Sequence, residues 1–154
     1  MQYKVCNEDL YAFYAKNYSS LAPTRQGDGA LDMRACIKEE VTALDPGESR
    51  MMGTGLMVAI PEFWCGFLLP RSGLSTKYSI KLANDVGFID SNFRNEVKVV
   101  LKNESEKPFS IERLDRIAQL AIVPHYDYHK LTRVAYLPES VRGDSKGFNS
   151  SGVK

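Results

Sequence analysis

From about residue 29 onward, the chain is divided into short apolar runs by closely spaced turn signals. The turn signals are DPGE at 45–48, GTG at 53–55 and PRSG at 70–73. Further along the chain, Val97, Val99 and Leu101 occupy alternate positions, which is the period of a strand with one buried face. Many short strands at this spacing predict an all-β fold, an antiparallel sandwich or jelly roll, built as one domain from 154 residues.

The secondary structure of two segments is less clear from their hydrophobic period. Residues 8–16 can form a short helix capped by Asn7, with Leu10, Phe13 and Tyr14 on one face, which we interpret as a docking helix or arm. Residues 114–123 fit a helix or a strand, but the β-branched end of this run and the following Pro124 favour a strand.

The charge balance excludes some partners. Twenty basic and 19 acidic residues leave a net charge of +1, which argues against a duplex DNA-binding protein but not against a small anionic substrate. The most apolar stretch, 56–69, is broken by Pro61, Glu62 and Gly66, so it does not fit a membrane span. We therefore expect no nucleic-acid partner and no membrane partner.

The N-terminus lacks a basic region followed by an apolar run, so no signal peptide is expected. The three cysteines are scattered and form no CxxC pair, which suits free thiols in a reducing compartment; they are Cys6, Cys36 and Cys65. These features predict a cytoplasmic protein, in the host cytoplasm if the chain is viral.

The segment PRSGLS at 70–75 has the residue types that hold phosphate. Arg71 offers a planar guanidinium, Ser72 a hydroxyl, and Gly73 a backbone that an anion can approach closely. Taken alone, the segment also fits an ordinary surface turn.

The segment ANDVGFIDSNF at 83–93 places Asn84 and Asp90 on either side of an apolar centre. An Asn amide has the donor and acceptor that pair with a uracil edge, and an Asp carboxylate can act as a general base on water. Taken alone, the stretch is better explained by an ordinary hairpin with turn-forming Asn and Asp.

Two later segments add polar groups. Gln119 lies within the apolar run of DRIAQL at 115–120, as a satisfied core amide or as a group directed into a site. The tail from Arg142 is rich in Gly, Ser and Asn and carries one aromatic residue, Phe148, which could stack on a base. For an arbitrary tail, a disordered terminus is the simpler interpretation.

Taken in order, these segments resemble the five motifs of the trimeric dUTPase family. They read GALDMRA at 29–35, PRSGLS at 70–75, VGFIDSNF at 86–93, RIAQL at 116–120 and RGDSKGFNSSG at 142–152. The resemblance covers residues 29–152. Related dCTP deaminases share the fold but lack the closing tail.

The resemblance implies a distorted jelly roll that assembles as a homotrimer with shared active sites. Each site would take the third motif from one chain, the first, second and fourth from a neighbour, and the tail from the third chain. The boundary would lie between a jelly-roll domain at 1–141 and a flexible C-terminal arm at 142–154 that closes over substrate on an adjacent subunit. The implied activity is Mg²⁺-dependent hydrolysis of dUTP to dUMP and pyrophosphate, which limits uracil in DNA and supplies dUMP for dTMP synthesis.

Carried over residue by residue, the resemblance also implies roles. Asp90 would activate the attacking water, Phe93 would exclude a ribose hydroxyl, and Asp32 with Gln119 would contact waters around Mg²⁺. The uracil would be read by Asn84 and the hairpin backbone, including Gly87, Phe88 and Ile89. The remaining substrate-binding residues would be Arg71, Ser72, Gly73, Lys98, Arg142, Phe148, Ser150 and Ser151.

Three rival functions remain open at this level. A dCTP deaminase or bifunctional relative would release ammonia from dCTP. A nucleotide-binding regulatory protein would keep the pocket with reduced turnover. A structural jelly-roll subunit, such as a capsid protein, would have no nucleotide affinity.

Overall fold

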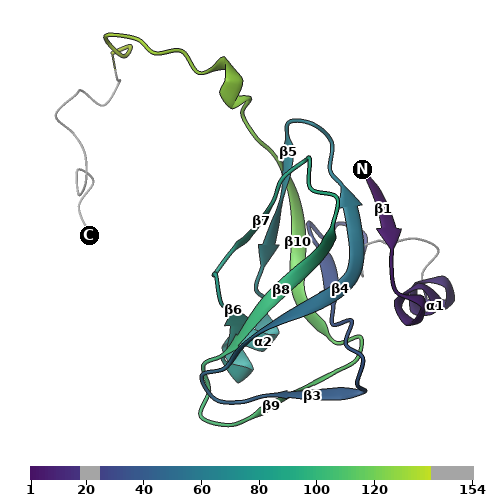
Figure 1. Cartoon of the computed structure of the whole chain (residues 1–154). Helices are drawn as coiled ribbons and strands as arrows, with labels where there is room; N and C mark the ends of the chain where they lie inside the picture. Colours follow the sequence, from purple (N-terminus) through teal and green to yellow (C-terminus); the bar gives the residue numbers. More distant parts are fainter. Residues whose placement is uncertain (18–24, 140–154) are drawn as a thin grey trace.

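The computed structural model describes residues 1–17 and 25–139 and consists mainly of β-strands (Figure 1). The elements run in the order β1 (Gln2–Val5), α1 (Glu8–Asn17), β2 (Leu31–Arg34), β3 (Val41–Leu44), β4 (Ser49–Ala59), β5 (Trp64–Leu69), α2 (Ser72–Tyr78), β6 (Ile80–Leu82), β7 (Gly87–Ile89), β8 (Glu96–Asn103), β9 (Phe109–Glu112), β10 (Arg116–Pro124) and η1 (Tyr128–Lys130).

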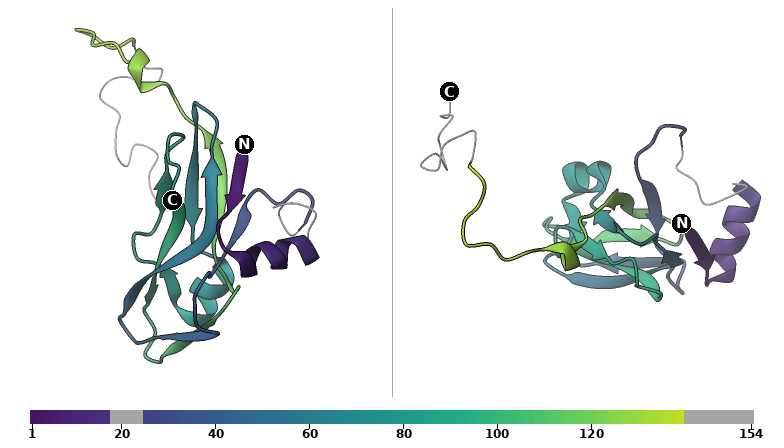
Figure 2. Two further views of the ribbon diagram at one scale, coloured as in Figure 1. Left: turned by 45° about the vertical axis from the view of Figure 1, so that its right-hand side comes forward. Right: turned by 90° about the horizontal axis from the view of Figure 1, so that it is seen from above.

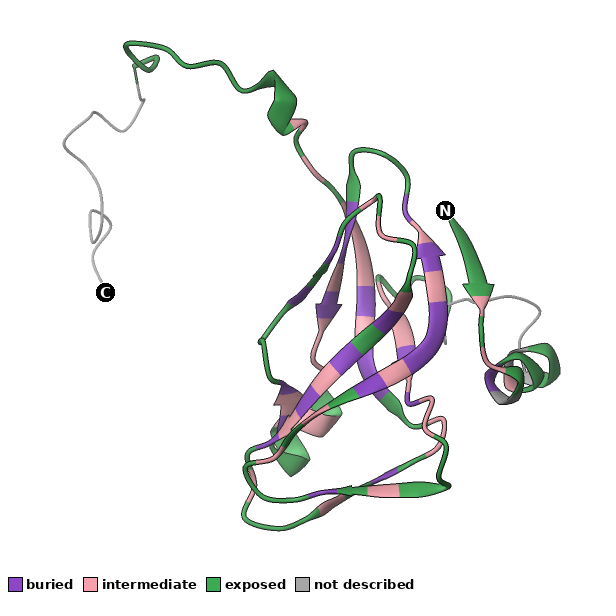
Figure 3. Ribbon diagram, viewed as in Figure 1, coloured by how far each residue is buried: buried purple, intermediate pink, exposed green. Residues whose placement is uncertain are grey.

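Two four-stranded antiparallel sheets face each other across the core (Figure 2). One has the strand order β1-β4-β8-β6 and the other β2-β10-β5-β7, while β3 and β9 form a separate pair. Buried side chains from both sheets meet between them (Figure 3), among them Val97, Val99 and Leu101 from β8 and Leu68 and Leu120 from the other sheet. The arrangement is the expected all-β jelly roll.

Strand β8 shows how the sequence pattern produces the core. Its buried residues Val97, Val99 and Leu101 alternate with more exposed neighbours, because successive side chains of a strand point to opposite faces. The same alternation confirms the period-two prediction made for this segment. The predicted strand at 114–123 is also confirmed as β10, which begins at Arg116 and ends at Pro124.

The expected N-terminal helix is α1. The Asn7 side chain accepts a hydrogen bond from the Leu10 backbone N–H at 3.0 Å and so caps the first turn. Leu10 is fully buried, and Phe13 packs against the core. The Arg34 guanidinium carbon lies over the Phe13 ring, 4.5 Å from its centroid. The helix therefore docks on the sandwich through Leu10 and Phe13 of the predicted face, while the side chain of Tyr14 lies outside what the structure describes.

Helix α2 was not expected, because PRSGLS was interpreted as a turn. Ser, Gly and Thr are weak helix formers, so its sequence SGLSTKY gives little local signal. The helix is held by bonds within it, such as Thr76 Oγ1 to the Ser72 carbonyl at 2.5 Å, and by Leu74, which packs against the core. It stops where Ser79 adopts a left-handed conformation with φ of 55°.

Beyond β10, the chain leaves the body of the sandwich and continues as an exposed segment that contains η1 (Figures 1 and 3). This segment carries large apolar side chains that face solvent, namely Tyr126, Tyr128, Leu131, Val134, Tyr136 and Leu137. The predicted boundary at residue 141 lies outside the described residues. Within the described part of the chain, no helix is long and apolar enough to cross a membrane.

Candidate active site

One open pocket of about 510 Å³ brings together residues from three of the five motif segments. Asp32 lies in β2, Arg71 is the residue before α2, and Gln119 lies in β10. The other lining residues are Arg25, Asp28, Gly29, Ala30, Leu69, Arg116 and Ala121. We call this space the arginine pocket, because Arg25, Arg71 and Arg116 all line it.

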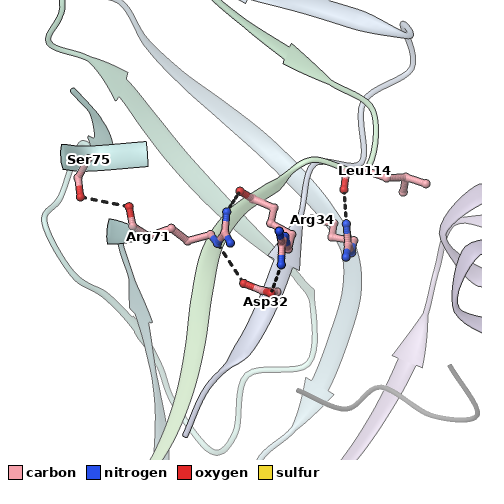
Figure 4. A network of polar contacts seen from close by, with 6 residues as sticks. Asp32, Arg34, Arg71, Ser75 and Leu114 are labelled. Atoms are coloured by element: carbon pink, nitrogen blue, oxygen red, sulfur yellow. Dashed lines mark hydrogen bonds and ion pairs between the residues drawn. The ribbon is translucent and has the colours of Figure 1, made fainter. Parts of the chain in front are cut away.

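The polar groups of the arginine pocket are linked to one another (Figure 4). Arg71 Nε lies 3.0 Å from Asp32 Oδ1, and Arg71 Nη1 donates to the Arg116 carbonyl at 3.1 Å. The Arg116 guanidinium reaches back to the second oxygen of Asp32, with Nη1 3.4 Å from Oδ2. One carboxylate therefore lies between two guanidinium groups, and the cluster keeps a net positive charge that favours an anion.

Strand pairing explains why Asp32 and Gln119 face the same space. They are direct partners in the β2–β10 ladder, and Gln119 is also the partner of Leu69 in β5. Directly paired residues project from the same face of a sheet. Gln119 is partly exposed in the pocket, so the structure favours a site residue over a core amide.

The donor set of this pocket fits a hydrated Mg²⁺ ion held through water. Carboxylate and amide oxygens suit Mg²⁺, which keeps several of its waters in proteins. Each oxygen of Asp32 accepts from an arginine, and a carboxylate has about four acceptor positions in all. In residues 1–17 and 25–139 there is no group of three or more His, Cys, Asp or Glu side chains that could hold a metal directly.

A second, smaller cavity of about 130 Å³ gathers the predicted uracil-reading residues. It is lined by Leu68, Leu82, Asn84, Gly87, Phe88, Ile89, Lys98, Val99 and Val100. We call it the hairpin cavity. It shares no lining residue with the arginine pocket.

Strand β7 contributes an open edge to the hairpin cavity. It is the last strand of its sheet and pairs only with β5, so its other side presents backbone groups that are not used in a ladder of the described sheets. Gly87 is buried, and a Cβ at this position would lie 2.9 Å from the Leu68 Cβ. A glycine is therefore needed for β7 to pack closely beside β5.

Asp90 follows β7 directly and is exposed to solvent. Its carbonyl accepts a hydrogen bond from the Phe93 backbone N–H at 3.1 Å, so a tight turn connects the two residues. Phe93 is half-buried and packs against the core, which restrains its ring. Asp90 does not line the arginine pocket of its own chain.

The other predicted site residues lie apart from these two spaces or outside the described ranges. Ser72 and Gly73 are exposed at the start of α2, beside Arg71, and do not line the arginine pocket. The tail residues Arg142, Phe148, Ser150 and Ser151 fall outside the residues that the structure describes.

Two arginines that line the pocket, Arg116 and Arg25, were not predicted from the sequence. Arg116 lies inside the RIAQL segment, but Gln119 is the residue of this segment that was predicted to face the site. Arg25 precedes the first motif and carries no recognisable pattern. Nothing in the local sequence indicates that either side chain lies in the same pocket as Asp32.

Comparisons with known proteins agree with the motif pattern. The dUTPase family model matches residues 16–152. The deoxyuridine 5'-triphosphate nucleotidohydrolase of Neisseria meningitidis serogroup A is 43% identical over 129 residues, which are 83% of this chain and 84% of that protein. The enzyme of the same name from Escherichia phage T5 is 39% identical over 128 residues, covering 80% of this chain and 85% of the phage protein.

The fold agrees as well. A solved structure of the G164S mutant of the Staphylococcus bacteriophage 80alpha dUTPase, with dUpNHpp, superimposes with a TM-score of 0.78 and 27% sequence identity, covering 99% of this chain and 98% of that one. The family model, the relatives and the fold lead to the same conclusion: this chain belongs to the dUTPase family.

Proposed function

We propose that this protein is a dUTP diphosphatase, which hydrolyses dUTP to dUMP and pyrophosphate with Mg²⁺. The observation that carries the proposal is the grouping of the motif residues. Asp32, Arg71 and Gln119, expected to contact phosphates and metal waters, line the arginine pocket, and the expected uracil-reading residues of the hairpin line the hairpin cavity, namely Asn84, Gly87, Phe88 and Ile89. This grouping occurs in a chain that belongs to the dUTPase family.

The hairpin cavity would select the base. The Asn84 amide supplies a donor and an acceptor, and the open edge of β7 supplies backbone groups for the remaining polar positions of uracil. Buried Leu68 and Leu82 form apolar walls, and the narrow hairpin would leave no room for the methyl group of thymine. Lys98 at the rim would contact the nucleotide.

The sugar and the attacking water would lie beside the turn at 90–93. The Phe93 ring would pack under the deoxyribose and clash with a 2′-hydroxyl. The Asp90 carboxylate would accept a proton from water as the water oxygen attacks the α-phosphorus. The bond from the α-phosphorus to the bridging oxygen then breaks, and pyrophosphate leaves.

The arginine pocket would receive the phosphates. Arg71, with Ser72 and Gly73 beside it, would hold phosphate oxygens, and Asp32 with Gln119 would hydrogen-bond to waters of the metal. When bound, Mg²⁺ neutralises the charge of the triphosphate and fixes its shape. Arg142, Ser150 and Ser151 of the tail would contact phosphates, and Phe148 would stack on uracil.

We further propose that three copies assemble as a homotrimer and share their sites. Two features support this. The arginine pocket and the hairpin cavity are separate within one chain, so a single nucleotide would take one from each of two copies. The segment after β10 exposes six large apolar residues away from the body of its own chain, a surface that a second copy would cover.

A pyrophosphate-release assay with dUTP, dTTP, dCTP and UTP, each with and without Mg²⁺, tests the function. With Mg²⁺ we expect rapid pyrophosphate release from dUTP and from none of the other three nucleotides. Without the metal, release from dUTP should be slow. Ammonia release from dCTP would instead support a deaminase. Binding of dUTP without turnover would support a regulatory protein, and sedimentation as a monomer would contradict shared sites.

A further inference from the structure

The β2–β10 ladder contains an irregularity next to the arginine pocket. Gln119 pairs with Asp32 and Ala118 with Met33, but Arg116 pairs with Arg34, so the register shifts between Arg116 and Ala118. Two residues of β10 therefore lie opposite one residue of β2, which is the pattern of a β-bulge.

The bulge changes the direction of the Arg116 side chain. Arg116 and Gln119 are an odd number of positions apart in the sequence, so in a regular strand they would face opposite sides of the sheet. Instead, Ile117 and Ala118 are both buried, at 2% and 0% exposure, and Arg116 lines the same pocket as Gln119. The bulge thus turns a cationic side chain from the core side to the pocket side.

On the pocket side of the sheet, Arg116 contacts two neighbouring residues. Its guanidinium Nη1 lies 3.4 Å from Asp32 Oδ2, while its carbonyl accepts from Arg71 Nη1 at 3.1 Å. Asp32 Oδ1 is already bound by Arg71 Nε at 3.0 Å. The three residues form a closed ring of contacts that holds the carboxylate on both oxygens and the Arg71 guanidinium on two nitrogens (Figure 4).

We propose that Arg116 is a positioning residue of this site and acts through Asp32. Without its guanidinium, Asp32 Oδ2 loses this contact while Oδ1 keeps Arg71, so the carboxylate would turn toward Arg71 and away from the metal waters. Because Asp32 is 18% exposed and Arg71 21%, both lie where water screens their interaction only partly. This inference rests on the proposed function of the arginine pocket.

The inference is tested by a double-mutant cycle with Arg116→Gln, Asp32→Asn and the double variant. We expect Arg116→Gln to lower kcat/KM for dUTP by about 10- to 100-fold, the range typical of residues that orient metal-site ligands. We also expect a higher Mg²⁺ concentration for half-maximal rate. The double variant should be no slower than Asp32→Asn alone, and Arg116→Lys should recover part of the rate.

Arg50→Gln is the matched control. Arg50 is exposed to a similar degree, 41% against 42%, and is also ion-paired and hydrogen-bonded, to Glu48 and Thr42, but it does not line the pocket. It should keep the wild-type rate and Mg²⁺ dependence. Thermal unfolding of each variant separates lost folding from lost positioning.

Two results would overturn the inference: a wild-type rate in Arg116→Gln, or effects of Arg116→Gln and Asp32→Asn that simply multiply. Multiplying effects would mean that Arg116 acts independently of Asp32. Failure of the proposed function has a different signature, since the wild-type protein would then release no pyrophosphate from dUTP.

Discussion

Asp32 and Arg71 are 39 positions apart in the sequence and form an ion pair, with Arg71 Nε 3.0 Å from Asp32 Oδ1. The sequence assigned them separate tasks, metal waters for one and phosphate for the other. In the structure the two side chains restrain each other, so the proposed metal-water contact and the proposed phosphate contact would depend on one ion pair. Replacing either residue is therefore expected to disturb both tasks.

Asp90→Asn should bind dUTP nearly as well as the wild type but turn it over about 10²–10⁴-fold more slowly, because an amide cannot accept the proton of the attacking water. Steady-state kinetics combined with calorimetric titration of a non-hydrolysable dUTP analogue measures both properties. Asp85→Asn, on the connection before β7 and with no assigned role, should keep the wild-type rate. Full activity in Asp90→Asn would remove the general base from the mechanism.

Phe93→Ala should weaken discrimination against ribose. With the ring removed, a 2′-hydroxyl has room, so the ratio of kcat/KM for UTP to that for dUTP should rise by at least about tenfold. The ratio is the right measurement because loss of folded protein lowers both values equally. Phe93→Tyr keeps the ring and should leave the ratio unchanged; an unchanged ratio in Phe93→Ala as well would show that the ring does not sense the sugar.

Gly87→Ala should destabilise the protein by about 1–3 kcal/mol, because the added Cβ would lie 2.9 Å from the Leu68 Cβ and the strands must move apart. Chemical denaturation measures the loss. Gly73→Ala is the contrast for stability, since a Cβ there meets no atom within 4 Å and the position is helical. Equal stability of the two variants would mean that β7 and β5 tolerate a wider spacing.

Removal of residues 142–154 should abolish turnover while the trimer persists, because the proposed arm closes over substrate but the sandwich supplies the core. Sedimentation analysis and the pyrophosphate assay measure the two properties. Removal of Val153 and Lys154 alone spares every proposed contact and should change little. A shortened chain that works at the wild-type rate would exclude a catalytic role for the arm.

Much of the fold could be predicted from local patterns. Val97, Val99 and Leu101 were expected on one face of a strand, and they are buried in β8. Asn7 and Leu10 were expected to cap and dock a helix, and they do so in α1. Such predictions succeed because burial imposes a period on residues that are close in the sequence.

Helix α2 shows where local reasoning fails. Its Ser, Gly and Thr residues favour turns, and the packing of Leu74 together with the hydrogen bonds at Arg71 and Ser72 stabilises the helical form. Tertiary contacts here outweigh weak local preferences.

By itself, the sequence determined the all-β class through its turn signals and alternation, and the family through the order of its motifs, which also grouped Asp32, Arg71 and Gln119. The tertiary structure decided the contacts within that group: Arg71 pairs with Asp32, and a bulge turns Arg116 toward the same carboxylate. The physical reason is that alternation reports which face of a strand is buried, whereas strand pairing and register decide which distant side chains meet.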